Sequence, residues 1–71
     1  MNTIDTTGLS CPQPMLMVKK ALEKMQTGTL TVLADAEASR ENITRAASVL
    51  GWQKSGETLD NGIYTMTFTA K

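Results

Sequence analysis

The chain has 71 residues, of which 41% are hydrophobic and 20% charged, so it lies near the smallest size at which one core supports a fold without disulfides or metal. Its seven basic and seven acidic residues cancel, which leaves no overall electrostatic attraction to nucleic acid or an anionic membrane. One cysteine and no histidine exclude an internal disulfide, a Cys-His dyad and a Cys-x-x-Cys couple. We therefore expect one domain over residues 1–71, without metal or cofactor.

The N-terminal third predicts a strand, a turn and a helix. Residues 2–5 are typical of a short strand, and Thr6-Thr7-Gly8 is typical of the turn that follows it. Between Pro12 and Met25, apolar residues recur at steps of three and four, which predicts an amphipathic helix. The inward positions of this helix are Met15, Val18, Ala21, Leu22 and Met25. Thr27-Gly28 is expected to end it.

The middle of the chain predicts a buried strand and a second helix. Residues 29–34 (TLTVLA) are β-branched and apolar, as in a central strand. In the helix that follows, Ser39 is the expected N-cap and Gly51 the expected C-terminal glycine. The predicted inward residues are Ile43, Ala46, Ala47 and Leu50.

The C-terminal third predicts a hairpin. Residues 52–59 form a third strand that Gly56 is expected to break, and Asp60-Asn61-Gly62 is a strong turn signal. Residues 63–70 alternate apolar and threonine side chains, as in a strand with one buried face. The order βαβαββ predicts an α+β two-layer sandwich, in which two helices cover one face of a four-stranded mixed sheet.

The segment Cys11-Pro12-Gln13-Pro14 carries the most distinctive chemistry of the chain. Pro12 suits the first helical position, which places Cys11 at the N-cap and leaves the Gln13 N–H as the main free donor of the first turn. The positive end of the helix dipole and this N–H favour a thiolate, so the residues predict a nucleophilic Cys11 with a lowered pKa. A second interpretation stays open, because lone cysteines are often small buried hydrophobes.

Basic and methionine side chains offer further candidates. Lys19, Lys20 and Arg40, together with Arg45, could form a docking surface for a partner, although a solvated helix face explains them as well. The methionines are expected to pack in the core and not to bind metal. No run of apolar residues is long enough to cross a bilayer and no signal peptide pattern is present, so we expect a cytoplasmic protein that binds neither membrane nor nucleic acid directly.

The stretch Asp5–Pro14 (DTTGLSCPQP), followed by Lys19-Lys20 in the helix, resembles the TusA/SirA-like sulfur-carrier family with its G-L-x-C-P-x-P signature. Residues 39–47 and 50–52 are similar to its YedF-like branch, which is associated with selenium metabolism. The resemblance implies that Cys11 accepts sulfur and that Gly8, Pro12, Gln13 and Pro14 shape its loop. It also implies a sulfur donor, such as a cysteine desulfurase or another sulfurtransferase, and a downstream acceptor of sulfur or selenium.

The function expected from residues and resemblance together is a carrier that holds a persulfide, or selenium, on Cys11 and acts in a sulfurtransferase-like relay. The alternative is a non-catalytic binding or regulatory module, including the N-terminal domain of a larger two-domain protein.

Overall fold

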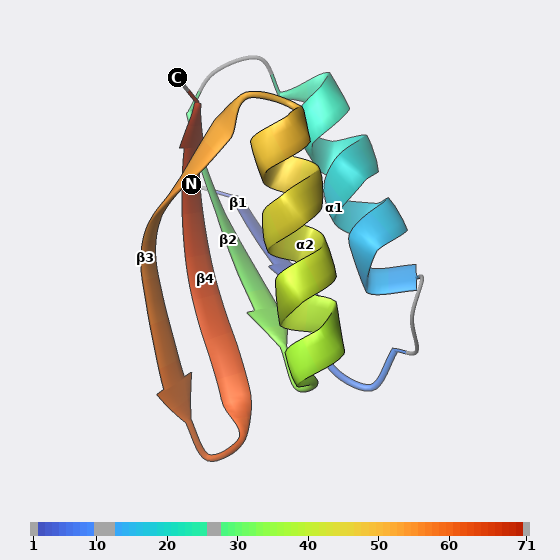
Figure 1. Ribbon diagram of the computed structural model, residues 1–71, viewed down its shortest axis with the longest axis vertical. Helices are drawn as coiled ribbons and strands as arrows, with labels where there is room; N and C mark the ends of the chain where they lie inside the picture. The colour runs from blue at the N-terminus through green and yellow to red at the C-terminus, as the bar shows by residue number, and fades with distance from the viewer. Residues whose placement is uncertain (1, 10–12, 26–27, 71) are drawn as a thin grey trace.

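The computed structural model describes residues 2–9, 13–25 and 28–70 (Figure 1). The elements in chain order are β1 (Asn2–Asp5), α1 (Gln13–Lys24), β2 (Thr29–Ala34), α2 (Glu37–Val49), β3 (Trp52–Asp60) and β4 (Ile63–Ala70). The predicted order βαβαββ is therefore confirmed. The expected N-cap at Cys11 and first helical position at Pro12 lie outside the described residues, as does Thr27.

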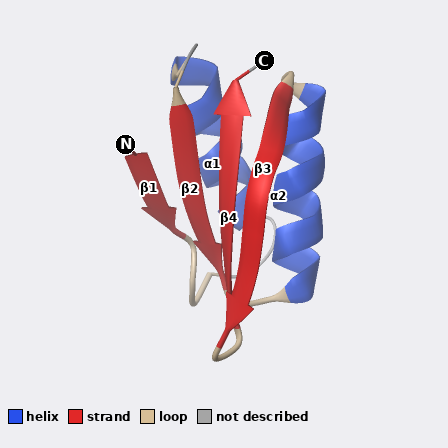
Figure 2. Cartoon of the chain, turned by 90° about the vertical axis from the view of Figure 1, so that its left-hand side faces the viewer, coloured by secondary structure: helices blue, strands red, loops and turns tan. Residues whose placement is uncertain are grey.

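The four strands form one mixed sheet in the order β1-β2-β4-β3. β1 runs parallel to β2, whereas β4 is antiparallel to both β2 and β3. Both helices lie on the same face of this sheet and leave the other face uncovered (Figure 2). This arrangement confirms the two-layer α+β sandwich and makes β2 a central strand, as its sequence predicts.

The core lies between the helices and the covered face of the sheet. Its buried hydrophobic residues are Val18, Leu22, Leu30, Val32, Ala34, Ile43, Ala47, Trp52, Met66 and Phe68. The spacing of Val18 and Leu22 on α1, and of Ile43 and Ala47 on α2, is one helical turn in each case, so each helix buries one stripe. Ala21 and Met25 pack against this core at its edge.

The start of α2 differs from the sequence prediction. The helix begins at Glu37, its N-cap is Ala36 in extended conformation, and no side chain caps it. Ser39 is buried instead of capping the helix. The reason is its position in the inward stripe, four residues before Ile43 and eight before Ala47, which turns its side chain toward the core. The prediction of Ser39 as N-cap was wrong.

The predicted break at Gly56 was also wrong, because β3 continues through this residue to Asp60. The pairing of β3 with β4 shifts register between Lys54 and Gly56, which leaves Ser55 as an extra residue. A β-bulge of this kind absorbs one residue without ending the strand. The glycine therefore marks an irregularity in an edge strand and not its end.

The turn between β3 and β4 confirms the hairpin prediction. Asn61 and Gly62 both have positive φ, 51° and 78°, as a two-residue type I′ turn requires. Asp60 pairs with Ile63 across it. In β4, Met66 and Phe68 are buried while the alternating threonines are only half-buried on the open face, so the predicted alternation is correct.

Candidate functional site

The turn before the Cys11 segment is anchored to the middle of the sheet by Thr6. This residue is 1% exposed, and its backbone N–H and its hydroxyl both donate to the Leu33 carbonyl. The Leu9 N–H in turn donates to the Thr6 carbonyl over 3.2 Å. Hydrogen bonds from a buried residue to a central strand hold the chain at a defined point. The turn at residues 6–9, which precedes Cys11 in sequence, is therefore fixed to β2.

Two carboxylates order the same turn. The Asp5 carboxylate accepts from the backbone N–H and the hydroxyl of Thr7, and these hydrogen bonds lower the pKa of Asp5. The Asp35 carboxylate accepts from the Gly8 N–H over 2.8 Å. Gly8 has a φ of 81°, a backbone conformation that glycine adopts without penalty, so the predicted turn glycine is confirmed.

Beyond the Cys11 segment, the chain enters α1 at Gln13. Pro14 is buried against the core, whereas Gln13 is exposed. Cys11 and Pro12 lie outside the described residues. In sequence, the sole thiol of the chain thus precedes the first residue of the 12-residue helix α1 by two positions.

Lys19 and Lys20 are exposed on α1 and line an open groove of about 570 Å³ along this helix. The groove residues are Leu9, Gln13, Leu16, Met17, Lys19, Lys20 and Glu23. Lys19 also lines a second groove, between α1 and α2, to which Arg45 contributes. Two of the predicted docking residues, Lys19 and Lys20, therefore line one surface together with Leu9 and Gln13, each of which is two residues from Cys11 in sequence.

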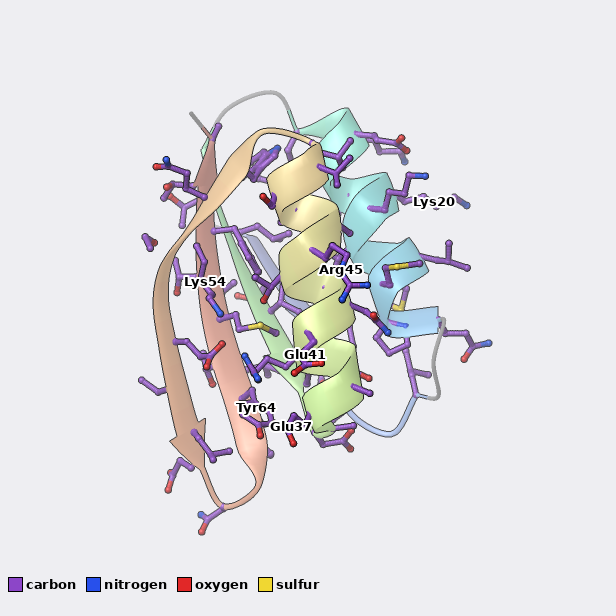
Figure 3. The ribbon with its side chains drawn as sticks, viewed as in Figure 1. Lys20, Glu37, Glu41, Arg45, Lys54 and Tyr64 are labelled. Carbon is purple, nitrogen blue, oxygen red and sulfur yellow. The ribbon has the colours of Figure 1, made fainter. Side chains whose placement is uncertain are left out.

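Arg40, the third predicted docking residue, faces elsewhere. Its guanidinium lies 5.4 Å from the centre of the Tyr64 ring and 3.7 Å from the Glu57 carboxylate. It lies 3.8 Å from Glu37 and from Glu41 as well. Figure 3 shows Tyr64 and Glu37 near the start of α2, away from Lys20. The side chain of Arg40 thus lies between α2 and the β3–β4 hairpin. A docking role for it stays a prediction.

Sequence reasoning missed the anchors of the turn, which are Asp5, Thr6 and Asp35. One of them carries a recognisable signal, because an Asp whose side chain accepts from the N–H two residues later forms a common turn motif. Asp35 carries no such signal, since its partner Gly8 is 27 residues away in sequence. Only the parallel pairing of β1 with β2 brings the two strand ends together.

Within the described ranges 2–9, 13–25 and 28–70, no group of three acidic, cysteine or histidine side chains could hold a metal ion. In the same part of the chain, neither helix has the length and apolar character needed to cross a bilayer.

The chain is thus a small two-layer α+β protein whose only cysteine precedes the first helix in sequence. A family model described as sulfurtransferase TusA matches residues 2–70. The chain is 33% identical over 63 residues to the sulfur carrier protein TusA of Pseudomonas entomophila strain L48. The aligned region covers 87% of this chain and 79% of that protein. The chain therefore belongs to the TusA family.

A solved structure agrees with this assignment. The crystal structure of a SirA-like protein from Desulfitobacterium hafniense superimposes with a TM-score of 0.88 at 38% identity, over 99% of this chain and 97% of that one. The resemblance to the TusA/SirA-like family is thus confirmed, and the finer placement in a YedF-like branch stays a prediction.

Proposed function

We propose that the chain is a sulfur carrier in which the Cys11 thiolate accepts sulfur as a persulfide and passes it to a partner protein. The observation that carries this proposal is the position of the only thiol, between the anchored turn that ends at Leu9 and the start of α1 at Gln13. Membership of the TusA family supports it, since a relative is described as a sulfur carrier protein.

The chemistry needs a thiolate, because the thiolate and not the thiol is the nucleophile. At a helix N-terminus, the dipole and free N–H groups favour negative charge and lower the pKa of a thiol. Lys19 and Lys20 lie six and seven residues beyond Gln13, which corresponds to roughly 9–11 Å along the helix axis. Backbone and helix geometry, and not a basic side chain of α1, therefore activate Cys11 in this proposal.

Loading and unloading are two balanced displacements. The Cys11 thiolate attacks the outer sulfur of a donor persulfide, a new S–S bond forms, the donor S–S bond breaks, and the donor leaves as a thiolate. In the second step a nucleophile of the acceptor attacks the outer sulfur on Cys11 and releases the Cys11 thiolate. Neither step needs an external oxidant or reductant. Because Cys11 attacks and leaves as a thiolate, neither step requires a proton transfer by this chain, which has no histidine.

The partners follow from this chemistry. The donor must itself carry a persulfide, as a cysteine desulfurase or another sulfurtransferase does, and the acceptor must supply a nucleophile. Selenium as an alternative cargo rests on the resemblance of residues 39–47 to a YedF-like branch. In the structure this stretch forms part of α2, and Ser39, Ile43 and Ala47 within it are buried, so core packing explains part of the resemblance without reference to cargo.

Mass spectrometry of the intact protein tests the proposal. After incubation with a purified cysteine desulfurase and cysteine, or with a small-molecule persulfide, the wild type should gain the mass of one sulfur atom, and treatment with a reductant should remove it. Cys11→Ser should gain nothing under the same conditions. An unmodified wild type with both donors would contradict the carrier role and favour a non-catalytic binding module.

A further inference from the structure

The groove on α1 extends from Leu9 and Gln13 along the exposed side of the helix. Leu9 and Gln13, which lie two residues before and two residues after Cys11 in sequence, both line this groove, and Glu23 lines it about three helical turns later. A partner that occupied the groove would therefore contact residues on both sides of Cys11 in sequence. Its location alone makes this surface a candidate for docking.

The groove exposes two apolar side chains that are not part of the hydrophobic core. Leu16 is 48% exposed and Met17 41% exposed, while Val18 and Leu22 already provide the buried stripe of α1. Two large adjacent apolar residues on the outer side of a helix, next to Leu9, form a contiguous apolar strip. Exposed strips with a polar rim are typical of interaction sites.

The rim of the groove carries two lysines and one glutamate, so its net charge is positive. Within the described residues, Lys19 and Lys20 form no ion pair, and neither does Arg45 of the second groove between α1 and α2. Arg40 and Lys54, in contrast, each pair with Glu57. Figure 3 shows Arg45 extending from α2 toward α1, with Lys20 on the outer side of α1. Although the whole chain is neutral, this helical surface carries an excess of positive charge that Glu23 only partly offsets. Its complement is acidic.

The occupant that fits both properties is a protein segment and not RNA. Recognition of single-stranded RNA relies on aromatic side chains that stack on bases. The aromatic residues of the chain are Trp52, Tyr64 and Phe68. All three lie on β3 or β4, and none lines the groove. An apolar strip with basic flanks instead matches an acidic segment that carries leucine-like side chains.

We propose that the α1 groove docks an acidic, apolar segment of the protein that loads or unloads Cys11. The apolar side chains of that segment pack on Leu16 and Met17, while its carboxylates face Lys19 and Lys20. The proposal rests on the proposed function for the identity of the partner, but the groove and its charge are independent of sulfur chemistry.

The test uses a synthetic helical peptide of glutamate and leucine as a probe, titrated into the isotope-labelled full chain and followed by backbone amide NMR shifts. The expected result is saturable binding that shifts the amides of α1 from Gln13 to Glu23 and weakens as salt is added. Lys20→Glu should weaken binding at least fivefold. Lys24→Glu is the matched control, because it makes the same charge change on α1 outside the groove, and it should bind nearly as well as the wild type.

An uncharged double variant and two control ligands complete the test. Leu16→Ser with Met17→Ser should also weaken binding, although these changes leave the charge unaltered. A peptide with lysine in place of glutamate, and a single-stranded RNA, should leave the α1 amides unshifted. Shifts confined to another surface, equal effects of Lys20→Glu and Lys24→Glu, or preferential binding of the RNA would overturn the proposal.

The result of the peptide-binding test does not depend on the result of the persulfide-loading test. Cys11→Ser should bind the peptide as the wild type does, and Lys20→Glu should still accept sulfur from a small-molecule persulfide. Failure of the groove would thus leave persulfide formation intact, whereas failure of the carrier role would leave peptide binding intact.

Discussion

The Gly8 backbone N–H donates a hydrogen bond of 2.8 Å to the carboxylate of Asp35, 27 residues further along the chain. Gly8 belongs to the turn after β1, and Asp35 follows the last residue of β2. Because β1 and β2 are parallel neighbours, their ends meet at one edge of the sheet. The turn that leads to Cys11 is thereby connected to the residues that precede α2.

Asp35→Ala removes the acceptor for the Gly8 N–H and should loosen this turn. We expect a loss of about 0.5–1.5 kcal/mol in the free energy of unfolding, the usual net contribution of one hydrogen bond. We also expect faster amide hydrogen exchange at Gly8 than in the wild type. Asp35→Asn keeps an acceptor oxygen and should restore much of the protection. Unchanged exchange at Gly8 in the alanine variant would show that the carboxylate does not hold the turn.

Gly8→Ala tests the positive φ of the turn. No heavy atom lies within 4 Å of a Cβ at this position, so the whole cost is conformational, about 1–2 kcal/mol for a residue other than glycine in this region. Gly56→Ala is the control, because the space around Gly56 is equally open and its φ is not positive. Chemical denaturation should show the larger loss for Gly8→Ala. Equal losses would contradict the positive φ assigned to Gly8.

Ile43→Val tests the packing of α2 on the sheet. Ile43 is fully buried, and the loss of one buried methyl group typically costs about 0.5–1.5 kcal/mol. Val49→Ala removes more atoms from the same helix, but Val49 is 80% exposed, so its effect should stay within about 0.5 kcal/mol. Urea unfolding of both variants measures the difference. A larger loss for Val49→Ala would mean that a partner or a second copy covers α2.

The spacing of apolar residues, which changes between helical and strand periodicity along the chain, was enough to predict all six helices and strands and the two-layer arrangement. The four-residue step from Val18 to Leu22 predicted the buried side of α1, and the two-residue step from Met66 to Phe68 predicted the buried side of β4. Both predictions were possible because each step depends only on the local geometry of a helix or a strand. Boundaries were predicted less well. Ser39 has the chemistry of a cap, yet the inward stripe of α2 determines its orientation.

The surroundings of the site depend on contacts that local patterns do not encode. The bond between Gly8 and Asp35 needs the pairing of β1 with β2, and the separation of Arg40 from Lys19 needs the packing of α2 on the hairpin. Cys11 itself was identified from its neighbours in sequence, because prolines and a helix start act over a few residues. Its chemistry stays a prediction that the mass measurement tests.

The last prediction concerns the ion pair between Glu57 and Lys54, whose carboxylate oxygen and ammonium nitrogen are 2.6 Å apart. The hydrogen bond from Lys54 is the largest cause that lowers the pKa of Glu57 below its ordinary value of 4.5, and Arg40 contributes further. A lowered pKa in the folded state means that the stabilising contribution is complete above pH 4.5 and is lost as the pH falls through the folded value.

Glu57→Gln should therefore be less stable than the wild type at neutral pH, and the difference should shrink as the pH falls below the ordinary glutamate value. Because the Glu57 side chain is 29% exposed, solvent screening limits the difference to about 0.2–1 kcal/mol. Urea unfolding at a series of pH values, at low and high salt, measures it. Glu23→Gln, which removes a carboxylate that forms no ion pair within the described residues, should keep the wild-type profile. If Glu57→Gln and the wild type differ equally at every pH, the loss comes from packing of the side chain and not from its charge.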